Sequence, residues 1–221
     1  MKCRLCNRQN LYKIKGQNLE KNNYFHCQNC DLIFLPADQM PSHHEERRRY
    51  MEHDNTFATE GYVNMFEEFI TEYIIPYKDK ITTALDFGCG PGPVLASLLK
   101  EENIKVDIYD PYFFPEQNYQ AKKYDLITST EVFEHLIQPD EELNKLVELV
   151  KPNKFLALMT SLHPGPQKLS QWNYRKDETH VTFYSWKTIV WITENFPLQI
   201  VKTDKKKNIL LQKTCSQPDN N

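Results

Sequence analysis

The chain has 221 residues, of which 40% are hydrophobic and 12% aromatic, so it has room for one domain of about 150 residues with a buried core and a small appendage. The formal net charge of −3 argues against a globally electropositive protein that wraps nucleic acid. A polar, basic start predicts no signal peptide, and no stretch approaches the roughly 18 apolar residues of a membrane span, so we expect a cytosolic protein with no membrane partner.

Two pairs of cysteines with C-x2-C spacing lie in the first 30 residues: Cys3, Cys6, Cys27 and Cys30. In a reducing cytosol such pairs favour metal binding over disulfides, and two short knuckles supply the four soft ligands of a tetrahedral structural Zn²⁺ site. A redox dithiol is the alternative, which the two copies in so short a segment disfavour. We interpret His26 as a surface residue and not as a further ligand. Residues 1–40 are therefore predicted to form a zinc ribbon of short hairpins.

Residues 41–76 are predicted to form a helical linker that packs on the main domain. The charged stretch from His43 to Asp54 is compatible with a helix, and a better helix is expected from Thr59 to Ile75. Its apolar residues recur at helical spacing and build one face. They are Tyr62, Phe66, Phe69, Ile70, Tyr73 and Ile74.

From Ile81 onward the pattern alternates strands and helices. Helices are expected at Val94–Glu101, from Pro139 to a stop at Lys151-Pro152, and from a Ser185 cap to Asn195. Strands are expected at Ile81–Phe87, Lys105–Asp110, Tyr124–Thr128 and Phe155–Thr160, with a final hairpin of Leu198–Lys202 and Ile209–Gln212. This alternation predicts an α/β fold, a Rossmann-like doubly wound and mainly parallel sheet over residues 77–214, followed by a polar tail at 215–221.

A glycine-rich turn follows the first of these strands and opens the next helix, with the acidic and glycine positions Asp86, Gly88, Gly90 and Gly92. Glycines allow a sharp turn and a close approach of a ligand to the backbone, and the helix N-terminus offers unpaired N–H groups. Asp110 closes the next strand 24 positions after Asp86, where a carboxylate can accept ribose hydroxyls. We expect a Gly88→Val side chain to occupy the ligand's space and abolish cofactor binding while leaving the fold largely intact.

The spacing Asp86-x-Gly88-x-Gly90-x-Gly92 differs from the G-x-G-x-x-G of dinucleotide folds and resembles motif I of class I S-adenosylmethionine-dependent methyltransferases. Residues 124–136 and 149–155 resemble that family's fourth-strand motif and its turn into the fifth strand. The resemblance covers roughly residues 77–213. It implies S-adenosyl-L-methionine as cofactor, bound by Asp86, Gly88, Gly90, Gly92, Asp110 and Thr130.

One feature departs from that family. Only 13 residues separate Asp110 from Tyr124, too few for the usual helix, third strand and adenine-binding loop together. Either the third strand or the helix is expected to be vestigial, with residues 111–123 covering the adenine in an abbreviated way.

Residues 171–185 follow the fifth predicted strand, at the sheet edge where such folds bind substrates. They resemble a segment of small-molecule-type methyltransferases with a Glu-Val-x-Glu-His signature. His180 is the candidate general base for the acceptor, with a structural tie between loop and sheet as the alternative. Glu131 and His135 are candidates to face the substrate, although a pair at this spacing is as often structural.

We therefore expect a methyltransferase that acts on a small-molecule or nucleoside-like acceptor. An RNA methyltransferase that reads its substrate with the zinc ribbon is the alternative within catalysis. Residues 1–30 carry six basic residues against Glu20, and four thiolates on Zn²⁺ would leave a charge near +3, a mild basic patch. The third possibility is a non-catalytic cofactor-binding protein.

Overall fold

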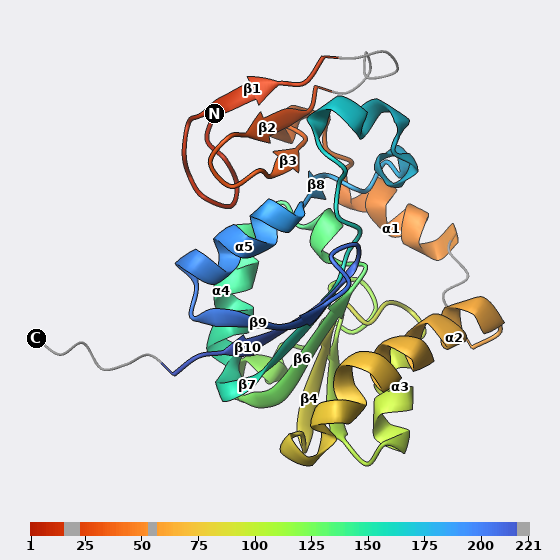
Figure 1. Ribbon diagram of the computed structural model, residues 1–221. Coiled ribbons are helices and arrows are strands. Elements are labelled where there is room, and N and C mark those ends of the chain that lie inside the picture. The colour runs from red at the N-terminus through yellow and green to blue at the C-terminus, as the bar shows by residue number, and fades with distance from the viewer. Residues whose placement is uncertain (16–22, 53–56, 216–221) are drawn as a thin grey trace, which may run out of the picture.

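Two β-sheets organise the protein. The computed structural model describes residues 1–15, 23–52 and 57–215. A six-stranded sheet has the order β5-β4-β6-β7-β10-β9, and a four-stranded sheet has the order β1-β2-β3-β8. Figure 1 shows the small sheet above the carboxyl ends of the parallel strands of the large one.

The large sheet is mainly parallel. Strands β5, β4, β6 and β7 are parallel neighbours, and β10 pairs antiparallel with both β7 and β9. Its strands are β4 (Thr83–Phe87), β5 (Lys105–Tyr109), β6 (Tyr124–Thr130), β7 (Val150–Met159), β9 (Leu198–Thr203) and β10 (Asn208–Lys213). The predicted doubly wound α/β fold is confirmed.

Helices cover both faces of the large sheet, which gives three layers (Figure 1). Helices α4 (Pro139–Leu149) and α5 (Trp186–Asn195) lie on one face, and α2 (Glu60–Phe69) and α3 (Val94–Glu101) on the other. Because side chains alternate along a strand, a strand contributes side chains to the apolar cores on both faces of the sheet. In β7, Leu156 packs beneath α4 and α5 whereas Phe155 packs beneath α2 and α3.

The linker region has more than one helical geometry. Helix α1 spans His43–Glu52, and the rest of its predicted range lies outside the described residues. The predicted helix from Thr59 to Ile75 is α2 followed by a π-helical turn at Ile70–Ile74 and a 3-10 helix at Ile75–Lys80. Pro76 lacks the N–H that an α-helix would need there, which accounts for the change to 3-10 geometry at Ile75–Lys80. The predicted apolar face is nevertheless buried, from Phe66 to Ile74.

Strand β7 begins earlier than predicted. Helix α4 ends at Leu149, and the strand starts at Val150 and not at Phe155. Val150 pairs with Tyr124 and Phe155 with Leu126, so residues 151–154 form a bulge. Proline is tolerated in strands at such bulges, and Pro152 therefore does not end the element.

The segment between β5 and β6 is abbreviated, as expected. Residues 111–123, all of them described, contain a backbone bridge between Asp110 and Phe114 and a 3-10 helix at Asn118–Ala121, but no strand and no α-helix. Strand β5 is consequently the edge of the large sheet.

The small sheet crosses the predicted boundary between the zinc ribbon and the main domain. Strands β1 (Leu11–Lys13), β2 (Phe25–Cys27) and β3 (Ile33–Phe34) come from the ribbon, whereas β8 (Thr182–Phe183) comes from the substrate segment and pairs with β3. Short 3-10 helices complete the described elements, at Ala37–Gln39, Phe133–His135, Pro166–Gln171 and Asn173–Lys176. Among the helices that the structure describes, none combines the length and the apolar character needed to cross a membrane.

Candidate active site

The two central glycines of the turn between β4 and α3 have different surroundings. Both have left-handed backbones, with φ of 81° at Gly88 and 67° at Gly90. A Cβ on Gly88 would lie 2.3 Å from Cγ2 of Val132, whereas a Cβ on Gly90 would meet no heavy atom within 4 Å. The expectation for Gly88→Val is therefore corrected: its side chain would clash with Val132 and strain the fold. The open approach to the backbone lies at Gly90.

Asp86 lies beneath this turn and does not line the cavity described below. Its side chain is buried, and Oδ1 accepts a hydrogen bond of 2.8 Å from the hydroxyl of Thr128. Burial raises the pKa of Asp86 to about 6, although the hydrogen bond from Thr128 lowers it. Gly92 also lies outside the cavity lining. The structure thus places Asp86 inside the fold, where it is hydrogen-bonded to β6 and does not face the cavity.

The raised pKa makes stability depend on pH in a predictable direction. The folded state binds the Asp86 proton more tightly than the unfolded state, so this contribution is complete below the unfolded pKa near 4 and is lost as pH rises through about 6. The loss is on the order of 3 kcal/mol. We expect Asp86→Asn to melt at a higher temperature relative to wild type at pH 7.5 than at pH 5. Thermal melts at both pH values measure this, with exposed Asp79→Asn as the control, and a pH-independent difference would contradict it.

Asp110 joins the glycine-rich turn to the segment that follows β5. Its Oδ2 accepts the backbone N–H of Gly90 at 3.0 Å, and its Oδ1 accepts those of Tyr112 and Phe113 at 2.9 and 3.1 Å. The carboxylate is only 7% exposed. Asp110 therefore holds the glycine-rich turn and the segment after β5 in place relative to each other.

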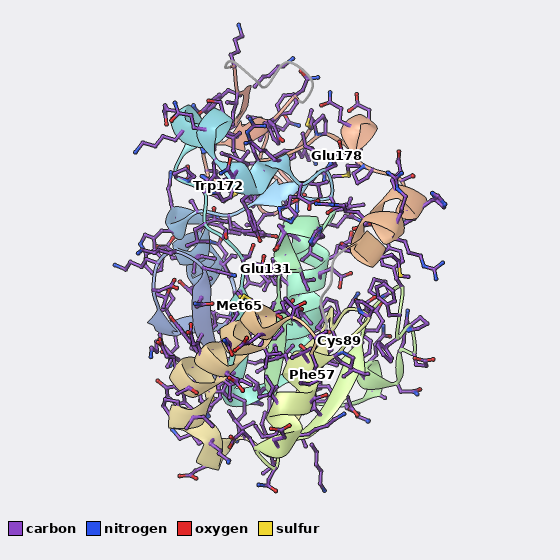
Figure 2. All side chains as sticks on the ribbon, turned by 90° about the vertical axis from the view of Figure 1, so that its right-hand side faces the viewer. Phe57, Met65, Cys89, Glu131, Trp172 and Glu178 are labelled. Atoms are coloured by element: carbon purple, nitrogen blue, oxygen red, sulfur yellow. The ribbon has the colours of Figure 1, made fainter. Side chains whose placement is uncertain are left out.

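A cavity of about 700 Å³ lies at the carboxyl ends of β4, β5 and β6. Four of the six predicted cofactor residues line this cavity, namely Gly88, Gly90, Asp110 and Thr130. Asp86 and Gly92 do not line it. All three predicted acceptor-side residues also line it, namely Glu131, His135 and His180. Figure 2 labels Cys89 and Glu131, two of the lining residues, near the middle of the molecule seen from this side.

Sequence reasoning did not predict the contribution of helix α1 to this cavity. His43, Glu46 and Tyr50 project from α1 into its lining. The hydroxyl of Tyr112 donates to Glu46 and lies 3.2 Å from Nδ1 of His43, so α1 is linked to the segment after β5. The sequence signal was weak, because the helix has a polar composition and residues 47 and 48 are exposed arginines.

The acceptor side of the cavity concentrates titratable groups. Glu131 follows β6 with a left-handed φ of 55°, and the 3-10 turn of Phe133–His135 comes next. Nδ1 of His135 lies 3.0 Å from the carbonyl oxygen of Thr179, and Nδ1 of His180 lies 2.7 Å from that of Tyr174. The two imidazole centroids are 4.8 Å apart. The structure therefore brings the two predicted histidines together, from segments 45 residues apart.

Sequence reasoning missed Glu134, which lies behind these histidines. It is fully buried, accepts a 2.8 Å hydrogen bond from the hydroxyl of Thr160, and contacts the hydroxyl of Tyr174. The hydroxyl oxygen of Tyr174 also lies 2.9 Å from Oε2 of Glu131, within hydrogen-bond distance. Burial, and then the charge of Glu131, raise the pKa of Glu134 well above its usual value. Two carboxyl groups thus share one tyrosine hydroxyl.

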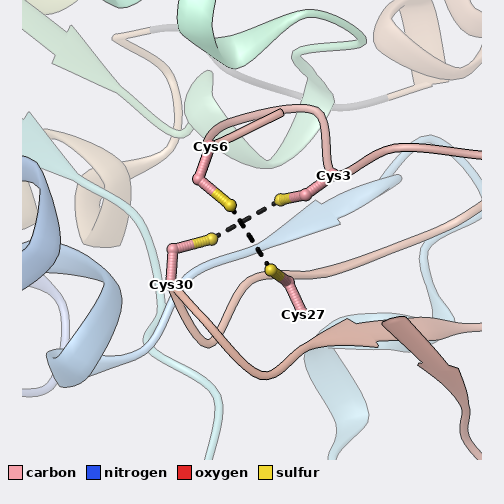
Figure 3. Close-up of side chains that lie close together, drawn as sticks. All are labelled: Cys3, Cys6, Cys27 and Cys30. Carbon is pink, nitrogen blue, oxygen red and sulfur yellow. Dashed lines mark hydrogen bonds between the residues drawn. The ribbon is translucent and has the colours of Figure 1, made fainter. Parts of the chain in front are cut away.

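The four cysteines of the N-terminal module converge on one point, as Figure 3 shows. The Sγ atoms of Cys3 and Cys30 are 3.5 Å apart, and those of Cys6 and Cys27 are 3.4 Å apart. Tetrahedral zinc with Zn–S bonds of about 2.3 Å places its sulfurs roughly 3.8 Å apart. The donor set and its spacing therefore fit a Zn²⁺ ion.

Asp31, whose side chain is partly buried, forms a polar contact between this module and the main domain. One carboxylate oxygen lies 2.6 Å from Nε2 of His26, and the other accepts a 2.6 Å hydrogen bond from the hydroxyl of Ser185, the cap of α5. The interpretation of His26 as a surface residue was wrong, since it is only 6% exposed. The contact with Asp31 across a tight turn gives this buried ring a polar partner.

Comparisons with known proteins agree with this architecture. A family model described as a methyltransferase domain matches residues 48–203. Among solved structures, a protein of Galdieria sulphuraria assigned as a sarcosine dimethylglycine methyltransferase is 13% identical with a TM-score of 0.52, over 70% of this chain and 87% of that one. At this identity the likeness shows the fold.

Two further structures are more distant. A SAM-dependent methyltransferase from Archaeoglobus fulgidus is 17% identical with a TM-score of 0.49, over 68% of this chain and 94% of that one. CurJ carbon methyltransferase is 11% identical with a TM-score of 0.41, over 61% of this chain, which spans about half (49%) of that one. No curated protein sequence matches. The family model covers more than half of the chain, and the chain therefore belongs to the methyltransferase-domain family.

Proposed function

We propose that the protein transfers a methyl group from S-adenosylmethionine to a small-molecule or nucleoside-like acceptor. The observation that carries this proposal is the cavity of about 700 Å³, which has the glycine-rich turn and Asp110 on one side and Glu131, His135 and His180 on the other. Its volume lies within the range of small-molecule sites, about 300–1,000 Å³. Such a space suits a small acceptor better than a folded RNA.

The residues of the first side suit the cofactor. The open space beside Gly90 allows a ligand to approach the backbone. Asp110 would accept the ribose hydroxyls, and Tyr112 and Phe113 would flank the adenine. Thr130, at the end of β6, lines the same cavity. When bound, the cofactor supplies a methyl group activated by a sulfonium, so positioning of the acceptor accounts for most of the rate.

The residues of the other side suit the acceptor. Each histidine donates its Nδ1 proton to a backbone carbonyl, so Nε2 is the ring nitrogen that can carry a lone pair. We propose that His180, with His135 and Glu131 beside it, acts there on the proton of the acceptor. The cysteine module, with Cys3, Cys6, Cys27 and Cys30 holding a structural Zn²⁺, supports this side through β8.

A substitution at Gly90 tests the cofactor site. Asparagine tolerates a left-handed backbone better than most residues, and its side chain would project into the open space. We expect Gly90→Asn to weaken binding of S-adenosylhomocysteine by about tenfold or more, equivalent to about 1.4 kcal/mol, with little change in melting temperature. Calorimetric titration measures this. Gly61→Asn, at an exposed position of α2, is the control, and unchanged affinity in the Gly90 variant would contradict the assignment.

The acceptor class is tested with the same two proteins. Wild type is incubated with radiolabelled methyl donor and a cell extract that has been separated into small-molecule, RNA and protein fractions. We expect label in the small-molecule fraction, and much less with Gly90→Asn. Label mainly in RNA would support the alternative substrate, and cofactor binding without any labelled fraction would support a non-catalytic protein.

A further inference from the structure

We propose that Glu134, His135 and His180 form a binding site for a divalent cation at the acceptor side of the cavity. One ligand atom from each residue lies within 4.8 Å of the other two. Three nitrogen or oxygen ligands spaced evenly around an ion at about 2.1 Å lie about 3.6 Å from one another. The three ligand atoms would therefore have to approach one another by up to about an ångström.

The histidines are already oriented as cation ligands usually are. A metal-binding imidazole generally donates its other ring N–H to a carbonyl or carboxylate, which fixes the tautomer and the direction of the ring. His135 donates to the carbonyl of Thr179 and His180 to that of Tyr174. In both rings the atom that would bind the cation is consequently Nε2.

The charge balance around Glu134 gives a second, independent reason for a cation. Tyr174 has a single hydroxyl proton but contacts the carboxyl groups of both Glu131 and Glu134. Lys207 lies 3.0 Å from the other oxygen of Glu131 and compensates its charge. Glu134 is fully buried, and the hydrogen bonds that its carboxyl group makes in the described part of the chain come from neutral groups, namely the hydroxyls of Thr160 and Tyr174 and a backbone N–H. A buried carboxylate requires a compensating charge or a proton, and a bound cation would provide the charge.

The ligand types indicate which cations fit. Two imidazoles and one carboxylate suit first-row divalent ions such as Mn²⁺, Co²⁺ or Zn²⁺ better than Mg²⁺, which prefers oxygen ligands. His135 and His180 line the cavity, so the remaining coordination positions would face the acceptor.

The role of the cation rests on the proposed function. An acceptor hydroxyl whose oxygen binds the cation would have a lowered pKa. The O–H bond then breaks, its electron pair stays on the oxygen, and the proton passes to water. His180 would in this case act as a ligand, and the cation would take over the task of a side-chain base. The acceptor class that follows is a small molecule with an ionisable hydroxyl.

Binding of Mn²⁺ to the full chain, measured by electron paramagnetic resonance and by calorimetry, tests the site. Mn²⁺ is chosen because it prefers nitrogen and oxygen ligands and so discriminates against the four thiols. We expect one Mn²⁺ per chain in wild type, and an affinity at least about tenfold lower in Glu134→Gln and in His135→Asn. Two variants are used because Glu134 is buried and its replacement can unfold the protein. His44→Asn, at an exposed position of α1, is the control.

The outcomes separate this proposal from the proposed function. Absence of Mn²⁺ binding to wild type, or wild-type affinity in both folded variants, would overturn the cation site. Binding of S-adenosylhomocysteine is measured in the same samples without Mn²⁺. Cofactor binding without Mn²⁺ binding would leave the methyltransferase proposal standing, whereas Mn²⁺ binding without cofactor binding would leave only the cation site.

Discussion

Removal of metal from the four-cysteine cluster is expected to abolish methyl transfer while cofactor affinity stays near that of wild type. Cys3, Cys27 and Cys30 belong to a buried apolar cluster that continues into the main domain, and the few apolar residues of so short a module cannot fold it by hydrophobic burial alone. Structural zinc sites contribute on the order of 10 kcal/mol to the folding of such modules. Without the ion we therefore expect β1, β2 and β3 to lose their order.

The effect should reach the acceptor side because the module shares its sheet with the main domain. Ile33 and Phe34 pair with Phe183 and Thr182 of β8, and the N–H of Leu35 donates to the carbonyl of Val181 at 2.9 Å. His180 lies two residues before this strand. Loss of β3 would thus release the segment that places His180, whereas the glycine-rich turn and Asp110 lie on other elements.

Metal analysis, titration with S-adenosylhomocysteine and a transfer assay on Cys27→Ser measure these effects together. Cys215→Ser, which removes an exposed thiol outside the cluster, is the control. One Zn²⁺ per chain in wild type and in the control, but not in Cys27→Ser, is the expected result. A fully reduced wild-type protein without stoichiometric metal would refute the zinc site, and full turnover in a metal-free variant would refute its link to the acceptor side.

Local patterns predicted most of the fold because the responsible interactions are local. The C-x2-C knuckles, the turn at Gly88 and Gly90, and the Ser185 cap each depend on residues a few positions apart. Short apolar runs that alternate with helical segments predicted the strands of the large sheet, because strands buried on both faces are apolar along most of their length. The short segment between Asp110 and Tyr124 predicted that either a strand or a helix would be vestigial, and the structure contains neither a strand nor an α-helix there.

The features that sequence reasoning missed depend on contacts between distant segments. Glu134 contacts Tyr174, and Asp31 contacts Ser185, across 40 and 154 positions respectively. Strand β8 has two residues, too few for a periodicity signal, and exists because β3 pairs with it. The cavity wall contributed by α1 similarly follows from the packing of Tyr50 against His135. Such pairings become visible only when the chain is folded.

Replacement of His180 by alanine is expected to lower the rate of methyl transfer by roughly a hundredfold or more, a size typical for the loss of a group that acts on the acceptor's proton. Affinity for S-adenosylhomocysteine should stay near that of wild type, because Gly90 and Asp110 lie on the other side of the cavity. Turnover, cofactor affinity and melting temperature are measured on the same preparation.

His180→Asn separates chemistry from support. The asparagine amide can still donate a hydrogen bond toward the carbonyl of Tyr174, which His180 reaches at 2.7 Å, but it lacks the nitrogen lone pair of Nε2. If His180 acts on the acceptor, directly or through a cation, both variants lose turnover at nearly wild-type stability. If the residue only ties the loop to the sheet, His180→Ala should melt earlier with weakened binding and turnover, and His180→Asn should restore all three. Wild-type turnover and stability in both variants would refute either role, because the loop would then hold its place without the imidazole.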